Sequence, residues 1–115
     1  MAQDKTNIEE TPKPGSKQLL NDTFRKSLGM TGSGRVVLTS GVDALPTDIK
    51  AKVFMAVRNY DNFDDGNDRY GEHDFGVIKL ADQPNIFWKF DYYDANYEYG
   101  GDANRLLTIM LASEY

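Results

Sequence analysis

The sequence contains no cysteine, and this absence removes several classes of chemistry. Disulfide bonds, thiolate metal sites and cysteine nucleophiles are all excluded, and nothing ties the chain to an oxidising compartment. No stretch approaches the roughly 18 apolar residues of a membrane span, and the polar N-terminus lacks the apolar core of a secretory signal. We therefore expect a cytoplasmic protein that makes no contact with a membrane.

Catalytic motifs are also scarce. His73 is the only histidine, and no serine or lysine pattern indicates a nucleophile. Thr31–Gly34 has two glycines but lacks the following Lys-Ser/Thr pair of a phosphate-binding loop. The sequence therefore predicts no catalytic residue and no cofactor.

Positive charge is scarce in the second half of the chain. Residues 1–58 carry 9 Lys and Arg against 6 Asp and Glu, a net charge of +3, whereas residues 59–115 carry 4 against 12, a net charge of −8. Such a field repels nucleic acid and favours cations or basic protein surfaces. The alternative is a solvated surface that only keeps the protein soluble.

The 115 residues are enough for a single hydrophobic core. Residues 1–15 are polar and rich in proline and glycine, which predicts a disordered tail, so the domain spans residues 16–115. Ser16 can cap a helix that ends at Gly29, and Pro46 and Thr47 can open a second helix with an apolar face from Ile49 to Tyr60.

Four β-strands are expected beside these two helices. The strand patterns cover residues 35–39, 75–80, 85–93 and 105–112, and the last is apolar on both faces, as expected of a central strand. The predicted fold class is α+β, in the order α-β-α-β-β-β. Two helices pack on one face of a four-stranded, mainly antiparallel sheet.

The most unusual segment is a polar, glycine-rich loop from Asn59 to Gly76. It carries six carboxylates and the single histidine, and it is much longer than the about four to six residues of a typical connection. Long ordered loops of this kind often carry function.

One alternative for this loop is a divalent metal site made by Asp61, Asp65 and Glu72. These residues match positions 1, 5 and 12 of a calcium-binding loop, with Gly66 at the turn. Position 3, however, is Phe63. The other reading is an ordinary loop in which Asp and Asn side chains cap the backbone at turns.

A second alternative is a small hydrolase with His73 as the base, because Glu72 and Asp74 flank this histidine. Successive residues of an extended segment alternate faces, so both carboxylates would point away from the ring. A structural histidine is the competing interpretation.

Tyrosines and acids are also interleaved after the third strand. Exposed tyrosines beside charges are common anchors of protein interfaces. The alternative is that they pack in the core or the hairpin. We predict a partner-binding surface formed by the loop and this segment together: Asp61, Asp64, Asp65, Asp68, Tyr70, Glu72, His73, Asp74, Tyr93, Asp94, Tyr97, Glu98 and Tyr99.

Several long segments, in order, resemble the bacterial family known as domain of unknown function 3768. They are Leu20–Arg25, Gly34–Val37, Tyr70–Gly76, Phe87–Asp94 and Leu107–Ala112, so the resemblance extends from about Gln18 to Tyr115. The resemblance implies a small accessory protein of proteobacteria, their plasmids or their phages. It does not indicate any particular activity. Arg69 stands where relatives tend to have proline, and residues 98–105 look shorter than the insertion usual there.

These observations favour a non-enzymatic acidic protein that binds a basic protein surface. Its narrowest form is an inhibitor of a nucleic-acid-binding defence complex, of the anti-CRISPR or anti-restriction type, because carboxylates can replace phosphates against Arg and Lys. Direct binding of nucleic acid is not expected, and the oligomeric state is left open.

Overall fold

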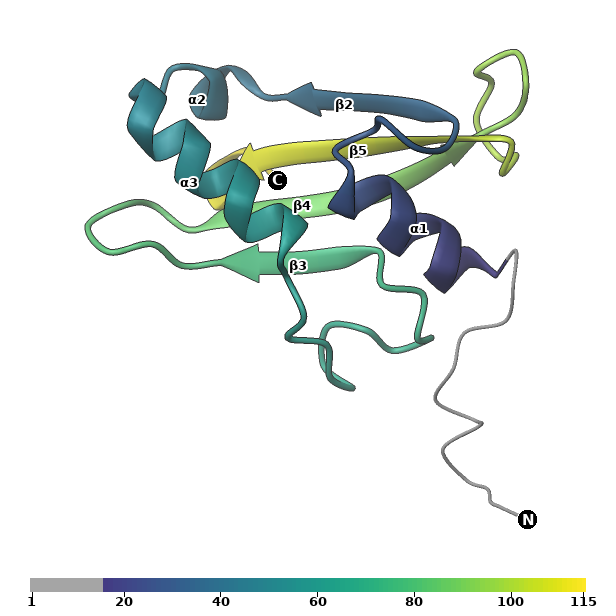
Figure 1. Ribbon diagram of the computed structural model, residues 1–115, viewed down its shortest axis with the longest axis horizontal. Coiled ribbons are helices and arrows are strands. Elements are labelled where there is room, and N and C mark those ends of the chain that lie inside the picture. Colours follow the sequence, from purple (N-terminus) through teal and green to yellow (C-terminus); the bar gives the residue numbers. More distant parts are fainter. Residues whose placement is uncertain (1–15) are drawn as a thin grey trace.

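The computed structural model describes residues 16–115, so the tail predicted over residues 1–15 lies outside the described residues. Figure 1 shows a sheet with its α-helices on one side. No helix in the described residues is long and apolar enough to cross a membrane. The elements, in chain order, are α1 (Lys17–Lys26), β2 (Gly34–Leu38), α2 (Ser40–Asp43), α3 (Thr47–Arg58), β3 (Phe75–Ile78), β4 (Ile86–Tyr93), β5 (Asn104–Leu111) and the 3₁₀-helix η2 (Ala112–Glu114).

Helix α1 forms where the sequence predicts it. The Ser16 hydroxyl accepts a hydrogen bond from the Leu19 N–H at 3.2 Å, which satisfies one of the free donors of the first turn. Phe24 is fully buried. After the helix, Gly29 has a φ of 84° and its N–H donates to the Phe24 carbonyl at 2.9 Å. This left-handed glycine ends the helix as expected.

Helix α3 also presents the predicted apolar face. Val53 and Val57 are fully buried in the core with Trp88 of β4, and Tyr60 packs edge-on against the Trp88 ring at 5.3 Å. A Cβ atom at Gly76 of β3 would overlap the rings of Trp88 and Tyr60. The absence of a side chain at Gly76 therefore allows the Trp88 and Tyr60 rings to pack directly over this strand.

The predicted sheet is right in its strands and wrong in part of its pairing. The strand order is β2-β5-β4-β3, and β5 is central as expected. β4 pairs antiparallel with both β3 and β5, but β2 pairs parallel with β5, so the sheet is mixed rather than mainly antiparallel. The chain crosses from β2 through α3 to β3 over one face of the sheet, and such a crossover returns the next strand in the same direction.

The predicted element order is also incomplete. The short helix α2 begins at Ser40, where the sequence analysis expects only the end of a strand, and buries Val42 completely. The 3₁₀-helix η2 follows β5, and the Glu114 carboxylate accepts a hydrogen bond from the Gly41 N–H at 2.9 Å. Four-residue and three-residue helices are too short to show a helical period, which explains why both were missed.

Candidate functional site

The acidic loop is attached to α1 through His73. The Nδ1 atom of His73 lies 2.9 Å from Asp22 Oδ1 and donates to that carboxylate, while Nε2 lies 3.2 Å from the Gln18 amide nitrogen. The Phe63 ring is stacked on the imidazole, with centroids 3.7 Å apart and planes inclined by 2°. The His73 N–H donates to Asp68 Oδ1 at 2.8 Å. His73 therefore joins two parts of the loop to α1.

Arg25 extends this attachment to the start of the loop. Its side chain is 1% exposed, forms an ion pair with Asp22 at 3.0 Å, and donates to the Val57 carbonyl at 2.7 Å. In return, Arg58 Nε donates to the Lys26 carbonyl at 3.0 Å. Each arginine thus satisfies a carbonyl at the C-terminal end of the other helix, where free carbonyls carry a partial negative charge.

The residues just before β3 are also held by α1. The fully buried Asn21 donates to the Glu72 carbonyl at 3.0 Å and to the Tyr92 hydroxyl at 2.8 Å. Burial, and then the charge of Glu72, raise the pKa of Asp74 above its usual range. Burial also raises the pKa of Tyr92 to about 12. We call residues 68–74, which rest against α1, the loop base.

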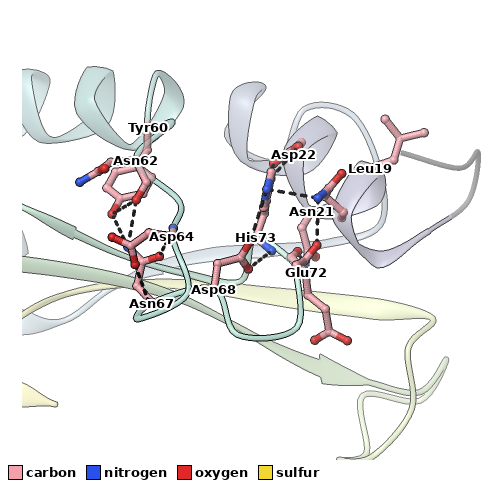
Figure 2. A network of polar contacts seen from close by, with 12 residues as sticks. Leu19, Asn21, Asp22, Tyr60, Asn62, Asp64, Asn67, Asp68, Glu72 and His73 are labelled. Carbon is pink, nitrogen blue, oxygen red and sulfur yellow. Dashed lines mark hydrogen bonds and ion pairs between the residues drawn. The ribbon is translucent and has the colours of Figure 1, made fainter. Parts of the chain in front are cut away.

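The preceding residues 61–67, which we call the loop tip, have hydrogen bonds of their own (Figure 2). Asp64 Oδ1 accepts from the N–H groups of Gly66 at 2.8 Å and Asn67 at 3.1 Å. The Asn67 side-chain oxygen accepts a hydrogen bond from the Asp64 N–H at 3.0 Å. Its amide nitrogen donates to the Asn62 carbonyl at 2.9 Å and to the Tyr60 hydroxyl at 3.1 Å. These bonds hold the tip as a defined turn.

Several predicted binding residues remain at the surface of this braced loop. Asp61 and Asp65 are exposed, and neither carboxylate has a hydrogen bond to another residue between 16 and 115. Tyr70 is 80% exposed, and the guanidinium of the exposed Arg69 lies 5.9 Å from its ring centroid. Glu72 is half-buried and its carboxylate points away from α1 (Figure 2).

The structure does not gather the predicted metal ligands. Among residues 16–115 there is no group of three or more His, Asp or Glu side chains that could hold a metal ion. Phe63, which breaks the calcium-loop pattern, fills a packing role, because its ring lies edge-on to Tyr60 at 5.1 Å and to Trp88 at 6.1 Å. The loop therefore has a packed aromatic side chain at the position where a calcium-binding loop has a metal ligand.

The partners of His73 differ from those that the sequence suggests. The carboxylate that holds its ring belongs to Asp22 rather than to Glu72 or Asp74. Its other ring nitrogen faces the Gln18 amide and, at 3.5 Å, Asp68 Oδ2. No hydroxyl group is among these partners. The arrangement fixes the ring in place, which agrees with the structural interpretation of this histidine.

The helical half of this site was not predicted from the sequence. Gln18, Asp22 and Arg25 project from α1 toward the loop, and their spacing of four and three residues puts them on one side of a helix. This polar stripe runs beside the apolar positions of the same helix, and it was the available signal. A cleft of about 600 Å³ opens beside it, lined by Asp22, Arg25, Lys26, Arg58, Asn59, Tyr60, Asp61, Phe63 and His73.

The predicted tyrosine segment forms a tight turn after β4. Asp94 Oδ1 accepts from the N–H groups of Asn96 and Glu98, both at 2.8 Å, so this carboxylate shapes the turn. Tyr99 is 83% exposed and pairs across an isolated bridge with the half-buried Tyr93. Tyr97 is 38% exposed, with the Arg35 guanidinium 4.4 Å from its ring centroid.

The two predicted binding segments lie at the same end of the sheet. β3 and β4 are antiparallel, so the start of β3, which follows the loop base, and the end of β4, which precedes the tyrosine turn, lie at the same end. A shallow cleft of about 290 Å³ at this end is lined by Lys17, Tyr92 and Tyr99, among others. The geometry thus brings the Glu98–Tyr99 turn to the same end of the molecule as Glu72 and Asp74.

Comparison with known proteins supports the family resemblance. No curated protein and no solved structure matches the chain. The model of the family described as "Protein of unknown function (DUF3768)" matches residues 38–114. The match includes the whole acidic loop and β3 to β5 but not α1, so it is shorter than the resemblance expected from Gln18 onward. Because the match covers about two thirds of the 115 residues, the chain belongs to this family of proteins of unknown function.

Proposed function

We propose that this protein is a non-enzymatic binding protein whose acidic loop engages a basic surface of another protein. The observation that carries the proposal is the contrast between a braced loop and the free carboxylates on it. The carboxylates of Asp61 and Asp65 are exposed without hydrogen bonds to other described residues, while the turn that contains Asp65 is held by Asp64 and Asn67. A backbone that is already held in one geometry loses little conformational entropy on binding.

The chemistry of the exposed residues suits arginine and lysine side chains. Ionised carboxylates accept strong hydrogen bonds from guanidinium and ammonium groups, and guanidinium groups can bind them through two bonds at once. Tyr70, which is 80% exposed, adds a large rigid ring to the surface of the loop base. Tyrosine is enriched among the residues that dominate binding energy at interfaces.

The tyrosine turn extends the proposed surface. Tyr99 is 83% exposed, and Glu98 beside it is exposed as well. Both lie at the end of the sheet where the loop base meets α1, so a partner that covers the loop base can reach them. Tyr93, Asp68 and Asp94 take smaller parts in this proposal, since they are half-buried or hydrogen-bonded within the protein.

The narrower role, inhibition of a nucleic-acid-binding defence complex, stays a prediction of this proposal. It requires that the partner use the same basic surface for phosphates. A purified partner should then release labelled DNA or RNA when this protein is added. Simultaneous binding of the nucleic acid and this protein would contradict the inhibitor role while leaving the binding function intact.

Affinity capture from a native host tests the proposed function with matched variants. D61N/D65N removes two charges from the loop tip, and D48N/D82N removes two charges from exposed positions at the start of α3 and in the β3–β4 turn. We expect the wild type and D48N/D82N to retain the same basic protein, and D61N/D65N to lose it. Equal retention by all three proteins would contradict a role for the loop tip.

A further inference from the structure

The face of the sheet opposite the helices is not covered by any α-helix in residues 16–115 (Figure 1). Alternation along the strands directs the buried Trp88, Phe90 and Leu107 toward the helices, and the residues between them toward the uncovered face. The register of the sheet places on that face, which we call the open face, Phe87, Lys89, Asp91 and Tyr93 of β4, Phe75 of β3 and Arg35 of β2.

The open face has aromatic groups at both ends of β4 and an ion pair between them. At one end, the ring of Phe87 lies 5.2 Å from Phe75 and 5.6 Å from the exposed Tyr115. At the other end, the ring of Tyr93 lies 6.0 Å from Tyr99. Midway, Lys89 and Asp91 pair with each other on the same face of β4.

From this arrangement we infer that the open face binds a second copy of the chain, related by a two-fold axis between Lys89 and Asp91. A two-fold axis that passes between two residues of a strand places each of them opposite the other residue in the second copy. Lys89 of one copy therefore faces Asp91 of the other, and Asp91 faces Lys89. The same operation places Phe87 opposite Tyr93. The charges and the aromatic groups are therefore self-complementary, which the surface needs in order to bind an identical copy.

The charge distribution of the whole chain also favours this face for self-association. The chain carries a net charge of −5, and the six carboxylates of the Asn59–Gly76 loop lie outside the open face. On the open face, Lys89 and Arg35 outnumber Asp91. Two copies can therefore meet here with little charge repulsion, and the acidic loop stays free for another partner. This inference does not depend on the proposed function.

The open face belongs to one four-stranded sheet whose strands have four to eight residues, so we expect a weak dimer with a dissociation constant of roughly micromolar order. Sedimentation equilibrium of the full chain tests this directly. The wild type should shift from the monomer mass of 13.0 kDa toward twice that mass as its concentration rises. A constant monomer mass up to the millimolar range would overturn the inference.

Charge variants test the axis itself. K89E and D91K each place like charges opposite each other across the two-fold axis, so each should raise the dissociation constant by more than about tenfold. Mixing the two variants in equal amounts should restore a dimer, because one face is then negative and the other positive. Pairing within a single chain cannot produce that recovery.

A matched control separates this effect from a change in net charge. K52E makes the same charge change on the exposed side of α3 and should leave the dimer unchanged. If K52E weakens the dimer as much as K89E does, or if the mixture of K89E and D91K stays monomeric, the open face is not the interface.

Discussion

The base and the tip of the acidic loop have the same kind of composition but different uses for their carboxylates. At the base, Asp68 binds the His73 backbone, and Asp74 is partly buried with a raised pKa. At the tip, Asp61 and Asp65 are exposed and make no hydrogen bond to another described residue. A count of acidic residues therefore overstates the binding surface, because part of the negative charge stabilises the loop.

The largest expected effect comes from breaking the support beneath the loop. Arg25→Met should lower the free energy of unfolding by about 3 to 5 kcal/mol, because it leaves Asp22 and the α3 carbonyls without their buried cation. Urea unfolding measures this change. Arg58→Met removes the reciprocal but exposed cap and should cost only about 1 kcal/mol. Equal losses in the two variants would contradict the unequal roles of the two arginines.

A smaller loss is expected at His73. His73→Ala removes the stacking on Phe63 and the bond to Asp22, and should cost about 2 kcal/mol of unfolding free energy. The backbone of His73 has a φ of 54°, a conformation that asparagine tolerates better than alanine. His73→Asn therefore serves as the control for backbone strain. Full recovery of stability in His73→Asn would show that the imidazole contacts contribute little.

Substitution of Asp74 should increase stability, in contrast to the preceding substitutions, and the increase should depend on pH. Burial, and then the charge of Glu72, raise the pKa of Asp74 in the folded state above its ordinary value of 3.8, so the folded protein holds this proton to a higher pH than the unfolded chain does. Stability is therefore lost as the pH rises through that interval. Asp74→Asn should raise the melting temperature at pH 7 by a few degrees, and the gain should vanish below pH 3.8.

Glu72→Gln provides the comparison for this pH effect. Because burial is the larger cause of the raised pKa of Asp74, removal of the Glu72 charge should give a smaller gain at pH 7 than Asp74→Asn. Thermal melts of both variants at several pH values distinguish the two contributions. A gain for Asp74→Asn that persists unchanged in acid would contradict an electrostatic origin.

Local sequence signals predicted much of the fold. The Ser16 cap, the apolar face of α3 with Val53 and Val57, and the central position of β5 were all readable, because each depends on residues close together in the chain. The parallel pairing of β2 with β5 was not predicted, since alternation within a strand does not specify its partner. The strand–helix–strand order was the overlooked signal.

The site was less predictable than the fold, because most of its contacts join residues far apart in the chain. The Asp64–Asn67 turn follows from residues three apart, and the sequence analysis anticipated that Asp and Asn would cap such turns. The contact between His73 and Asp22 joins residues 51 positions apart, and no local pattern in the loop indicates it. Long-range polar contacts of this kind depend on how α1 packs, which the loop sequence does not contain.

The smallest effect on stability should accompany the largest effect on binding, in D61N/D65N. We expect the free energy of unfolding of this variant to lie within about 0.5 kcal/mol of the wild-type value, since the two carboxylates make no bond to other described residues.

Titration calorimetry with the captured partner, at low and high salt, is the most direct test. The affinity of D61N/D65N should fall at least about tenfold below that of D48N/D82N, and high salt should narrow the gap. An affinity equal to the control, or a loss explained by unfolding of D61N/D65N, would contradict the claim that a braced loop presents free carboxylates to a basic partner.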